Sequence, residues 1–216
     1  YIMVTPDGER TMNTYLGAAQ DLTPADLDEA QIAAAEVVYL EGYLWDPPQA
    51  KAAFVKAAEI AHKNGRRVAL TLSDAFCVDR YRGEFLDLVR KGTVDIVFAN
   101  EHELRSLYET ADFDAGAKAL QQDAKLAVVT RSEKGCVVIG KDGMTAVAAA
   151  PIEQVADVTG AGDLFAAGFL VGLARGKDHR TAARLGGLAA AEVIQHIGAR
   201  PAVSLKALAA ENGLVV

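Results

Sequence analysis

At 216 residues, of which 51% are hydrophobic, the chain is long enough for one well-cored domain or for most of a larger one. Its formal net charge of −7 gives no broad attraction to nucleic acid or to anionic lipid. No apolar run approaches the ~18 residues of a membrane-spanning helix. We therefore expect neither nucleic acid nor a membrane among the partners of this chain.

The two cysteines, Cys77 and Cys136, show neither metal-binding spacing nor a disulfide framework. We interpret both as small buried hydrophobic side chains in a reducing, cytoplasmic compartment. The chain opens with Tyr-Ile-Met-Val-Thr, as if in the middle of a strand. We therefore expect that an N-terminal portion is missing, and with it any targeting segment.

The first residues predict a β hairpin. Asp-Gly is a favoured hairpin turn, and the pair at positions 7 and 8 separates candidate strands at 1–5 and 10–16. We assign residues 1–18 to part of a small β lid and residues 19–216 to an α/β domain that binds nucleotide and carries out catalysis.

The rest of the chain alternates between helical and β-branched stretches. Thr23 followed by Pro24 predicts a helix start, and we expect that helix to continue to about Ala34. The predicted strands that follow are 37–40, 68–72, 96–99 and 126–130, and a hairpin of 137–139 and 145–149. The predicted helices are 48–64, 79–91, 101–109, 113–122, 161–174, 179–197 and 204–211. This alternation favours a parallel sheet with helical crossovers.

The stretch from Ala156 to Phe165 carries the most chemistry. Gly160 and Gly162 let backbone N–H groups approach a ligand, and the start of a helix adds a positive dipole end, which suits a phosphate group. Asp163 lies in the first helical turn, where it would accept the proton of an attacking hydroxyl. On spacing alone, an ordinary helix start in which Asp163 stabilises the dipole explains these residues equally well.

The segment Asp157-Val158-Thr159-Gly160-Ala161-Gly162-Asp163 resembles the signature of the ribokinase-like, or PfkB, carbohydrate kinase family, with Val158 where Thr is common. The resemblance implies a three-layer, doubly wound, mostly parallel sheet flanked by helices, with part of a small β lid. It also implies that Asp163 is the catalytic base and that the amides of Gly160, Ala161 and Gly162 form the anion hole.

Two shorter segments follow the same family in the expected order. The run from Asn100 to Glu103 resembles the Asn-x-x-Glu motif, and the run from Thr130 to Gly135 resembles the Thr-x-x-x-x-Gly nucleotide segment. By resemblance, Asn100 approaches the phosphates of ATP, Glu103 holds Mg²⁺ through water, and Thr130 and Gly135 lie along the nucleotide. A plain capping box, with Asn100 as N-cap, explains the first motif as well.

Two further positions match roles found in family members. Asp157, with the carbonyl of Thr159 and the region near Gly198, corresponds to a monovalent-cation site, so K⁺ is an optional cofactor; the alternative is that Asp157 only hydrogen-bonds its own loop. Arg10 corresponds to a lid residue that lies over the substrate or the phosphates, and the alternative is an ordinary solvated hairpin arginine.

The resemblance implies an ATP- and Mg²⁺-dependent kinase that phosphorylates a hydroxyl of a nucleoside or sugar. Residues 8–18 and 40–46 look most like the bacterial adenosine-kinase-like branch. The N-terminal third of the family fold, which binds the acceptor, is not in the sequence. A sugar kinase of the ribokinase, fructokinase or ketodeoxygluconate kinase type therefore stays open, as does a nucleotide- or sugar-binding module without turnover. We expect a monomer or a homodimer.

Overall fold

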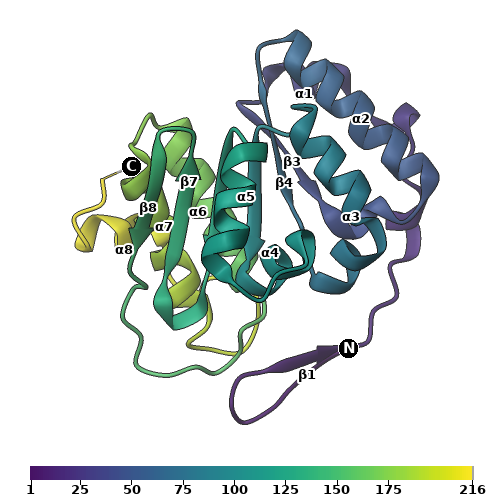
Figure 1. Cartoon of the computed structure of the whole chain (residues 1–216). Helices are drawn as coiled ribbons and strands as arrows, with labels where there is room; N and C mark the ends of the chain where they lie inside the picture. Colours follow the sequence, from purple (N-terminus) through teal and green to yellow (C-terminus); the bar gives the residue numbers. More distant parts are fainter. Residues whose placement is uncertain (216) are drawn as a thin grey trace. The chain divides into compact units, whose positions relative to one another are not determined.

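The computed structural model describes residues 1–215 and contains a six-stranded sheet with helices packed against it (Figure 1). The strands occur in the sheet in sequence order: β3 (Val37–Glu41), β4 (Arg67–Thr71), β5 (Ile96–Asn100), β6 (Leu126–Thr130), β7 (Cys136–Gly140) and β8 (Gly143–Val147). β3, β4 and β5 are parallel, with Val37 opposite Arg67 and Ala69 opposite Ile96. The predicted α/β class is confirmed.

The central strands are apolar at their interior positions because helices and neighbouring strands cover them. Val68, Ala69 and Leu70 of β4 are completely buried, as is Val97 of β5. Strands that are buried on both faces are expected to lack the alternation of polar and apolar residues that marks a half-exposed strand. The sheet is thus the core of the fold, and its strand ends are the places where polar residues gather.

Eight α-helices occur in residues 1–215, most of them where the sequence predicts them. Their bounds are α1 (Glu29–Ala34), α2 (Pro48–Lys63), α3 (Ala75–Arg90), α4 (Glu101–Tyr108), α5 (Phe113–Asp123), α6 (Ala161–Ala174), α7 (His179–Val193) and α8 (Leu205–Glu211). Short 3-10 turns span η1 (Gly17–Asp21), η2 (Pro24–Asp26), η3 (Gly42–Trp45) and η4 (Ser132–Lys134). None of these helices is both long and apolar enough to cross a bilayer.

The predicted helix from Thr23 to about Ala34 is wrong as a single element. Thr23 closes a capping box with Asp26 around the 3-10 turn η2, and Leu27 then takes an extended conformation. Asp28 starts α1 separately, because its carboxylate accepts the N–H groups of Ala30 and Gln31 at 2.9 and 3.1 Å. Two N-caps only five positions apart therefore produce two short elements.

Two other predicted helix bounds are wrong. α3 begins at Ala75, four residues before the predicted start, because the carboxylate of Asp74 accepts the N–H of Cys77 at 2.8 Å and caps the helix. α7 ends at Val193 rather than at 197. The Ile194 amide still donates to the carbonyl of Ala190 at 3.3 Å, but the Gln195 amide donates to that of Glu192, only three residues back, so the α-helical pattern stops.

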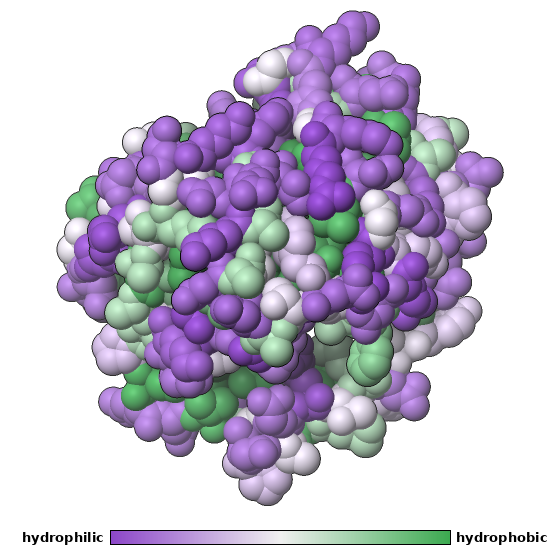
Figure 2. Space-filling model, viewed as in Figure 1, coloured by the Kyte–Doolittle hydropathy of each residue, from purple (hydrophilic) through white to green (hydrophobic). Residues whose placement is uncertain are grey.

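The chain divides into two compact units, which we describe separately. Unit 1 comprises residues 1–15, 130–138 and 145–216, and unit 2 comprises residues 16–129 and 139–144. The assignment of 1–18 to a lid and 19–216 to one domain stays a prediction. On the face shown in Figure 2, hydrophilic residues predominate and hydrophobic residues form small separate patches.

The predicted N-terminal hairpin is present in unit 1. β1 (Ile2–Val4) and β2 (Arg10–Met12) pair antiparallel, with Ile2 opposite Met12. The turn is longer than a two-residue connection, because the amide of Gly8 donates to the carbonyl of Thr5 at 2.9 Å and the strands resume only at Arg10. A two-stranded hairpin is marginally stable by itself, so its contacts with the rest of unit 1 matter.

Unit 2 has an aromatic and charged cluster beside its sheet. Trp45 is buried against Phe54 and Phe85, and its indole N–H donates to a carboxylate oxygen of Glu84 at 2.8 Å. The same carboxylate forms an ion pair with Lys51 at 2.7 Å. Trp45 is therefore a core residue whose indole N–H has a hydrogen-bond acceptor.

Candidate functional site

In unit 1, the loop before α6 is organised around the buried carboxylate of Asp157, which is 2% exposed. One of its oxygens accepts the N–H of Thr159 and the other accepts the N–H of Gly198, both at 2.9 Å. The Thr159 hydroxyl and the Gly198 amide, together with the charge of Arg10, lower the pKa of Asp157, while burial opposes them. The ionised carboxylate thus connects this loop to the chain that follows α7.

Gly160 gives the loop its shape at the start of α6. It is the N-cap residue in the left-handed region, with φ +82°. A Cβ at this position would lie 2.9 Å from the Cβ of Ala199 and 3.0 Å from its carbonyl oxygen. The backbone conformation and the close approach of Ala199 both require glycine.

The first amides of α6 have few partners. The first intrahelical bond runs from Leu164 N–H to the carbonyl of Gly160 at 2.9 Å, which leaves the N–H groups of Gly162 and Asp163 without an acceptor in the helix. The Ala161 amide reaches the carbonyl of Val158 at 3.3 Å. The space where Gly162 would carry a Cβ is open. Of the three amides predicted to form an anion hole, that of Gly162 has no acceptor in the helix and that of Ala161 makes a long hydrogen bond.

Asp163 lies in the first turn of α6, where its side chain is exposed to solvent. Surrounding protein still displaces part of its hydration, and this desolvation raises the pKa of Asp163, while the positive charge of Arg10 acts in the opposite direction. A carboxylate with a raised pKa and free access to solvent is suited to accept a proton.

The hairpin brings Arg10 toward this loop. The amide of Val158 donates to the carbonyl of Gly8 at 3.1 Å, two residues before Arg10 on the chain. Arg10 lowers the pKa of both Asp157 and Asp163. Among the residues predicted for the site, Arg10, Asp157 and the start of α6 are therefore close enough to interact within unit 1.

Thr130 and Gly135 bracket the 3-10 turn η4, also in unit 1. The amide of Arg131 donates to the carbonyl of Gly135 at 2.7 Å and closes the turn. Gly135 has φ +81°, and a Cβ there would collide with the carbonyl oxygen of Val147. This segment is a closely packed, hydrogen-bonded connection between β6 and β7.

Asn100 and Glu103 lie in unit 2, at the carboxyl end of β5 and in the first turn of α4. The predicted capping box is present: the Glu103 amide donates to Asn100 Oδ1 at 2.9 Å, and the Asn100 amide donates to Glu103 Oε2 at 2.9 Å. The Asn100 side chain also donates to Glu103 Oε1, at 2.7 Å. Both oxygens of the Glu103 carboxylate are therefore positioned by one residue.

The Glu103 carboxylate is only 4% exposed. Burial raises its pKa to about 7, the Asn100 amide opposes the shift, and the negative charges of Asp74 and Glu41 add to it. A cation placed beside this carboxylate would restore the charged form, and oxygen donors are the ligands that Mg²⁺ prefers. Within residues 1–215, no three or more His, Cys, Asp or Glu residues are grouped so that they could hold a metal ion.

Sequence reasoning missed the other polar residues near Glu103. Glu41 ends β3, and its carboxylate accepts the Ser73 hydroxyl at 3.2 Å. Ser73 is in the left-handed region, with φ 69°, and its oxygen accepts the amide of Tyr43 at 3.2 Å. The sequence could have indicated Glu41, because it is a polar residue at the end of an apolar strand and the carboxyl ends of parallel strands meet at one edge of a sheet.

A sequence profile described as pfkB family carbohydrate kinase matches residues 1–206. Adenosine kinase of Saccharomyces cerevisiae is 29% identical over 204 residues, which cover 88% of this chain and 58% of that protein. A probable sugar kinase from Rhizobium etli CFN 42 has a solved structure that is 54% identical, with a TM-score of 0.97, covering 99% of this chain and 65% of that one.

The solved structure of adenosine kinase from Sinorhizobium meliloti is 55% identical and has a TM-score of 0.96, covering 98% of this chain and 64% of that one. This chain therefore spans roughly three fifths of the length of the proteins it matches. The two solved structures cover 99% and 98% of the present chain, and the family profile, over residues 1–206, includes every residue that the sequence analysis singles out.

Proposed function

The chain belongs to the pfkB family of carbohydrate kinases, and we propose that its protein transfers the γ-phosphoryl group of ATP to a hydroxyl of a nucleoside, as an adenosine-kinase-like enzyme. The observation that carries the proposal is the start of α6, where Gly160 turns the chain at φ +82° and Asp163 follows in the first turn. The adenosine kinases among the similar proteins favour a nucleoside as the acceptor.

Asp163 is the catalytic base in this proposal. Its carboxylate accepts the proton of the acceptor hydroxyl as that oxygen forms a bond to the γ-phosphorus and the bond to the β-γ bridging oxygen breaks, so that ADP leaves. The amides of Gly160, Ala161 and Gly162 stabilise the charge on the transferred group. Arg10 lowers the pKa of Asp163 and so keeps more of the base ionised.

Asn100, Glu103, Thr130 and Gly135 would hold the nucleotide. Glu103 suits Mg²⁺ because both of its oxygens are oriented by Asn100, and a water-bridged ion would offset the burial that raises its pKa to about 7. When bound, Mg²⁺ neutralises charge on the phosphates. Thr130 and Gly135 bracket a hydrogen-bonded turn that would lie along the nucleotide.

A monovalent cation such as K⁺ belongs to the proposal as an optional cofactor near Asp157. The carboxylate is buried and ionised, and the Thr159 hydroxyl oxygen is buried without a hydrogen bond of good geometry in residues 1–215. Oxygen atoms with spare lone pairs next to a buried charge fit a hard cation. The amides of Thr159 and Gly198 already donate to the two carboxylate oxygens of Asp157. These hydrogen bonds weaken the attraction that the carboxylate would exert on a cation.

A sugar kinase is the second candidate, favoured by the similarity to a probable sugar kinase from Rhizobium etli. A binding module without turnover is the third, and the combination of Asp163 with the free amides of α6 speaks against it, because binding alone requires no base. The two buried free thiols, Cys77 and Cys136, fit the expected cytoplasmic location. Whether the protein is a monomer or a homodimer stays a prediction.

The test is ATP consumption by the full-length protein with Mg²⁺ and a panel of acceptors: adenosine, other nucleosides, ribose, fructose and ketodeoxy sugars. We expect turnover with adenosine and loss of most of it in Asp163→Asn. Turnover confined to a sugar would establish the second candidate. MgATP binding without turnover of any acceptor would favour the module.

A further inference from the structure

The residues that follow α7 contact the loop before α6 at several points, and we call residues 194–202 the 194–202 segment. The carbonyl of Ile194 accepts the amides of Ala156 at 2.8 Å and of Asp157 at 3.3 Å. The amide of Gly198 donates to the carboxylate of Asp157 at 2.9 Å. The segment therefore supports both the backbone and the side chain of Asp157.

The same segment also fixes the position of Gly160, because Ala199 lies against the place where a Cβ would be. The segment contains neither helix nor strand, so regular backbone hydrogen bonding does not determine its shape. Side-chain contacts therefore add to the backbone bonds of Ile194 in holding it against the loop before α6.

Glu192, in the last turn of α7, provides such a contact. Its Oε1 accepts the amide of Ala202 at 2.9 Å and lies 3.2 Å from Nε2 of His196. These bonds attach the far end of the 194–202 segment to the helix. Ile194, one residue beyond α7, attaches the near end to the loop before α6.

The carboxylate of Glu192 lowers the stability of the fold at this position. Its side chain is 9% exposed, and Oε2 is buried without a hydrogen-bond partner in residues 1–215. Burial of a carboxylate with an unsatisfied oxygen costs stability, and an apolar side chain of similar volume is often neutral or stabilising at such a site. A role beyond stability would account for the carboxylate.

We infer that Glu192 is a positioning residue for phosphoryl transfer, which rests on the proposed function. By holding Ala202, it keeps Gly198 and Ala199 against Asp157 and Gly160. The first amides of α6 and Asp163 are thereby aligned for the reaction. Glu192 touches neither nucleotide nor acceptor in this scheme; it acts through the segment.

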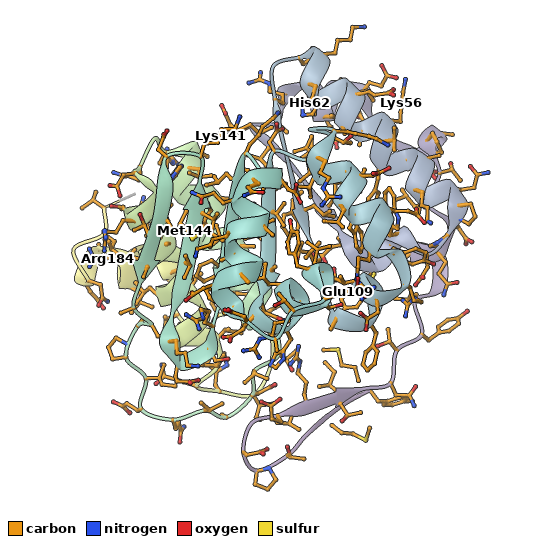
Figure 3. The ribbon with its side chains drawn as sticks, viewed as in Figure 1. Lys56, His62, Glu109, Lys141, Met144 and Arg184 are labelled. Carbon is orange, nitrogen blue, oxygen red and sulfur yellow. The ribbon has the colours of Figure 1, made fainter. Side chains whose placement is uncertain are left out.

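The experiment compares two variants of the full-length protein with the wild type. Glu192→Leu fills the volume but removes the acceptor for the Ala202 amide, whereas Glu192→Gln keeps an acceptor oxygen. Arg184→Ala is the matched control, because Arg184 is an exposed residue of the same helix (Figure 3). The readouts are kcat and KM with MgATP and adenosine, the thermal midpoint, and the ¹H–¹⁵N resonance of the Gly198 amide.

We expect Glu192→Leu to lower kcat by about 10- to 100-fold, with KM changed by less than about 3-fold, because misplacement of reacting groups mainly affects kcat. Its thermal midpoint should equal or exceed that of the wild type, and the Gly198 resonance should move. Glu192→Gln should keep kcat within about 3-fold of the wild type, and Arg184→Ala should leave kcat, KM, the thermal midpoint and the Gly198 resonance unchanged.

Three results would overturn the inference: a wild-type kcat in Glu192→Leu, a loss of kcat that merely follows a lowered thermal midpoint, or an equal loss in Glu192→Gln. If the wild type turns over no acceptor in the panel, the proposed function fails. The Gly198 resonance still decides the inference in that case, since an unchanged resonance in Glu192→Leu would show that Glu192 does not position the segment.

Discussion

Asn100 donates to both carboxylate oxygens of Glu103, from its backbone amide at 2.9 Å and from its side chain at 2.7 Å. The carboxylate is therefore held in one orientation although burial and the charges of Asp74 and Glu41 disfavour its ionised form. Because ionisation of Glu103 is unfavourable in the folded protein, its protonation should depend on pH and on whether a cation is bound, and should affect stability.

Glu103→Gln should make the ligand-free protein less sensitive to pH between 6 and 8. The folded pKa of Glu103, about 7, is above its ordinary value of 4.5, so its contribution to stability is complete below pH 4.5 and is lost as pH rises through 7. The shift corresponds to ~3 kcal/mol at full ionisation. Urea unfolding at pH 6 and pH 8 measures the effect.

The control for this variant is Glu109→Gln, because Glu109 is an exposed residue at the other end of α4 (Figure 3). It should keep the pH dependence of the wild type. Glu103→Gln should in addition require more Mg²⁺ for half-maximal turnover, since a neutral amide attracts the hydrated ion less strongly. An unchanged pH dependence would contradict the raised pKa of Glu103, and an unchanged Mg²⁺ requirement would contradict its role in holding the ion.

Asp163→Asn should reduce turnover by about 10²- to 10⁴-fold while MgATP still binds. The folded pKa of Asp163 is raised, so the stability that this group contributes is present below its unfolded pKa and is lost as pH rises through the folded pKa. At neutral pH the neutral Asn should leave the thermal midpoint unchanged or slightly higher. Steady-state kinetics measures the loss of turnover, and calorimetry measures the thermal midpoint. A variant with wild-type kcat would exclude Asp163 as the base.

Arg10→Gln should shift the acid limb of the kcat/KM profile to higher pH. Arg10 opposes the desolvation that raises the pKa of Asp163, so its removal leaves the base protonated over a wider pH range. Arg175→Gln, at the opposite end of α6, is a charge-matched control. Acid limbs that coincide in all three proteins would show that Arg10 does not tune the base.

Gly160→Ala should lower the free energy of unfolding by at least ~2 kcal/mol, because alanine is strained at φ +82° and its methyl group would meet Ala199. Gly176→Ala is the matched control: Gly176 also has a positive φ, of +67°, but the space for its Cβ is open. Unfolding in urea should show a larger loss at Gly160. Equal losses would mean that Ala199 moves aside without lowering the free energy of unfolding.

Gly162→Ala should separate catalysis from stability. The space for a Cβ at Gly162 is open and the residue is helical, so alanine should add ~0.5–1 kcal/mol to the free energy of unfolding. The methyl group would stand beside the amides that we assign to the phosphoryl group, and kcat should fall by ~10-fold or more. A variant that is more stable and fully active would place the anion elsewhere.

The sequence by itself determined the alternating elements and most of their bounds. Apolar runs such as Val68 to Leu72 form strands because burial favours them on both faces, and Asn100 with Glu103 forms a capping box because the spacing permits it. These features depend on neighbours along the chain. Of the bounds that failed, those at Asp28 and Asp74 depend on which of several closely spaced capping residues starts the helix.

Only the tertiary structure decided which distant residues act on one another. Glu41 and Asp74 raise the pKa of Glu103, and Gly198 holds Asp157 from 41 positions away. Local patterns specify helices and strands, whereas the electrostatic environment of a side chain depends on burial and on charges that folding brings near it. The proposed chemistry of Asp163 could be inferred from sequence, but its raised pKa and its dependence on Arg10 arise from the fold.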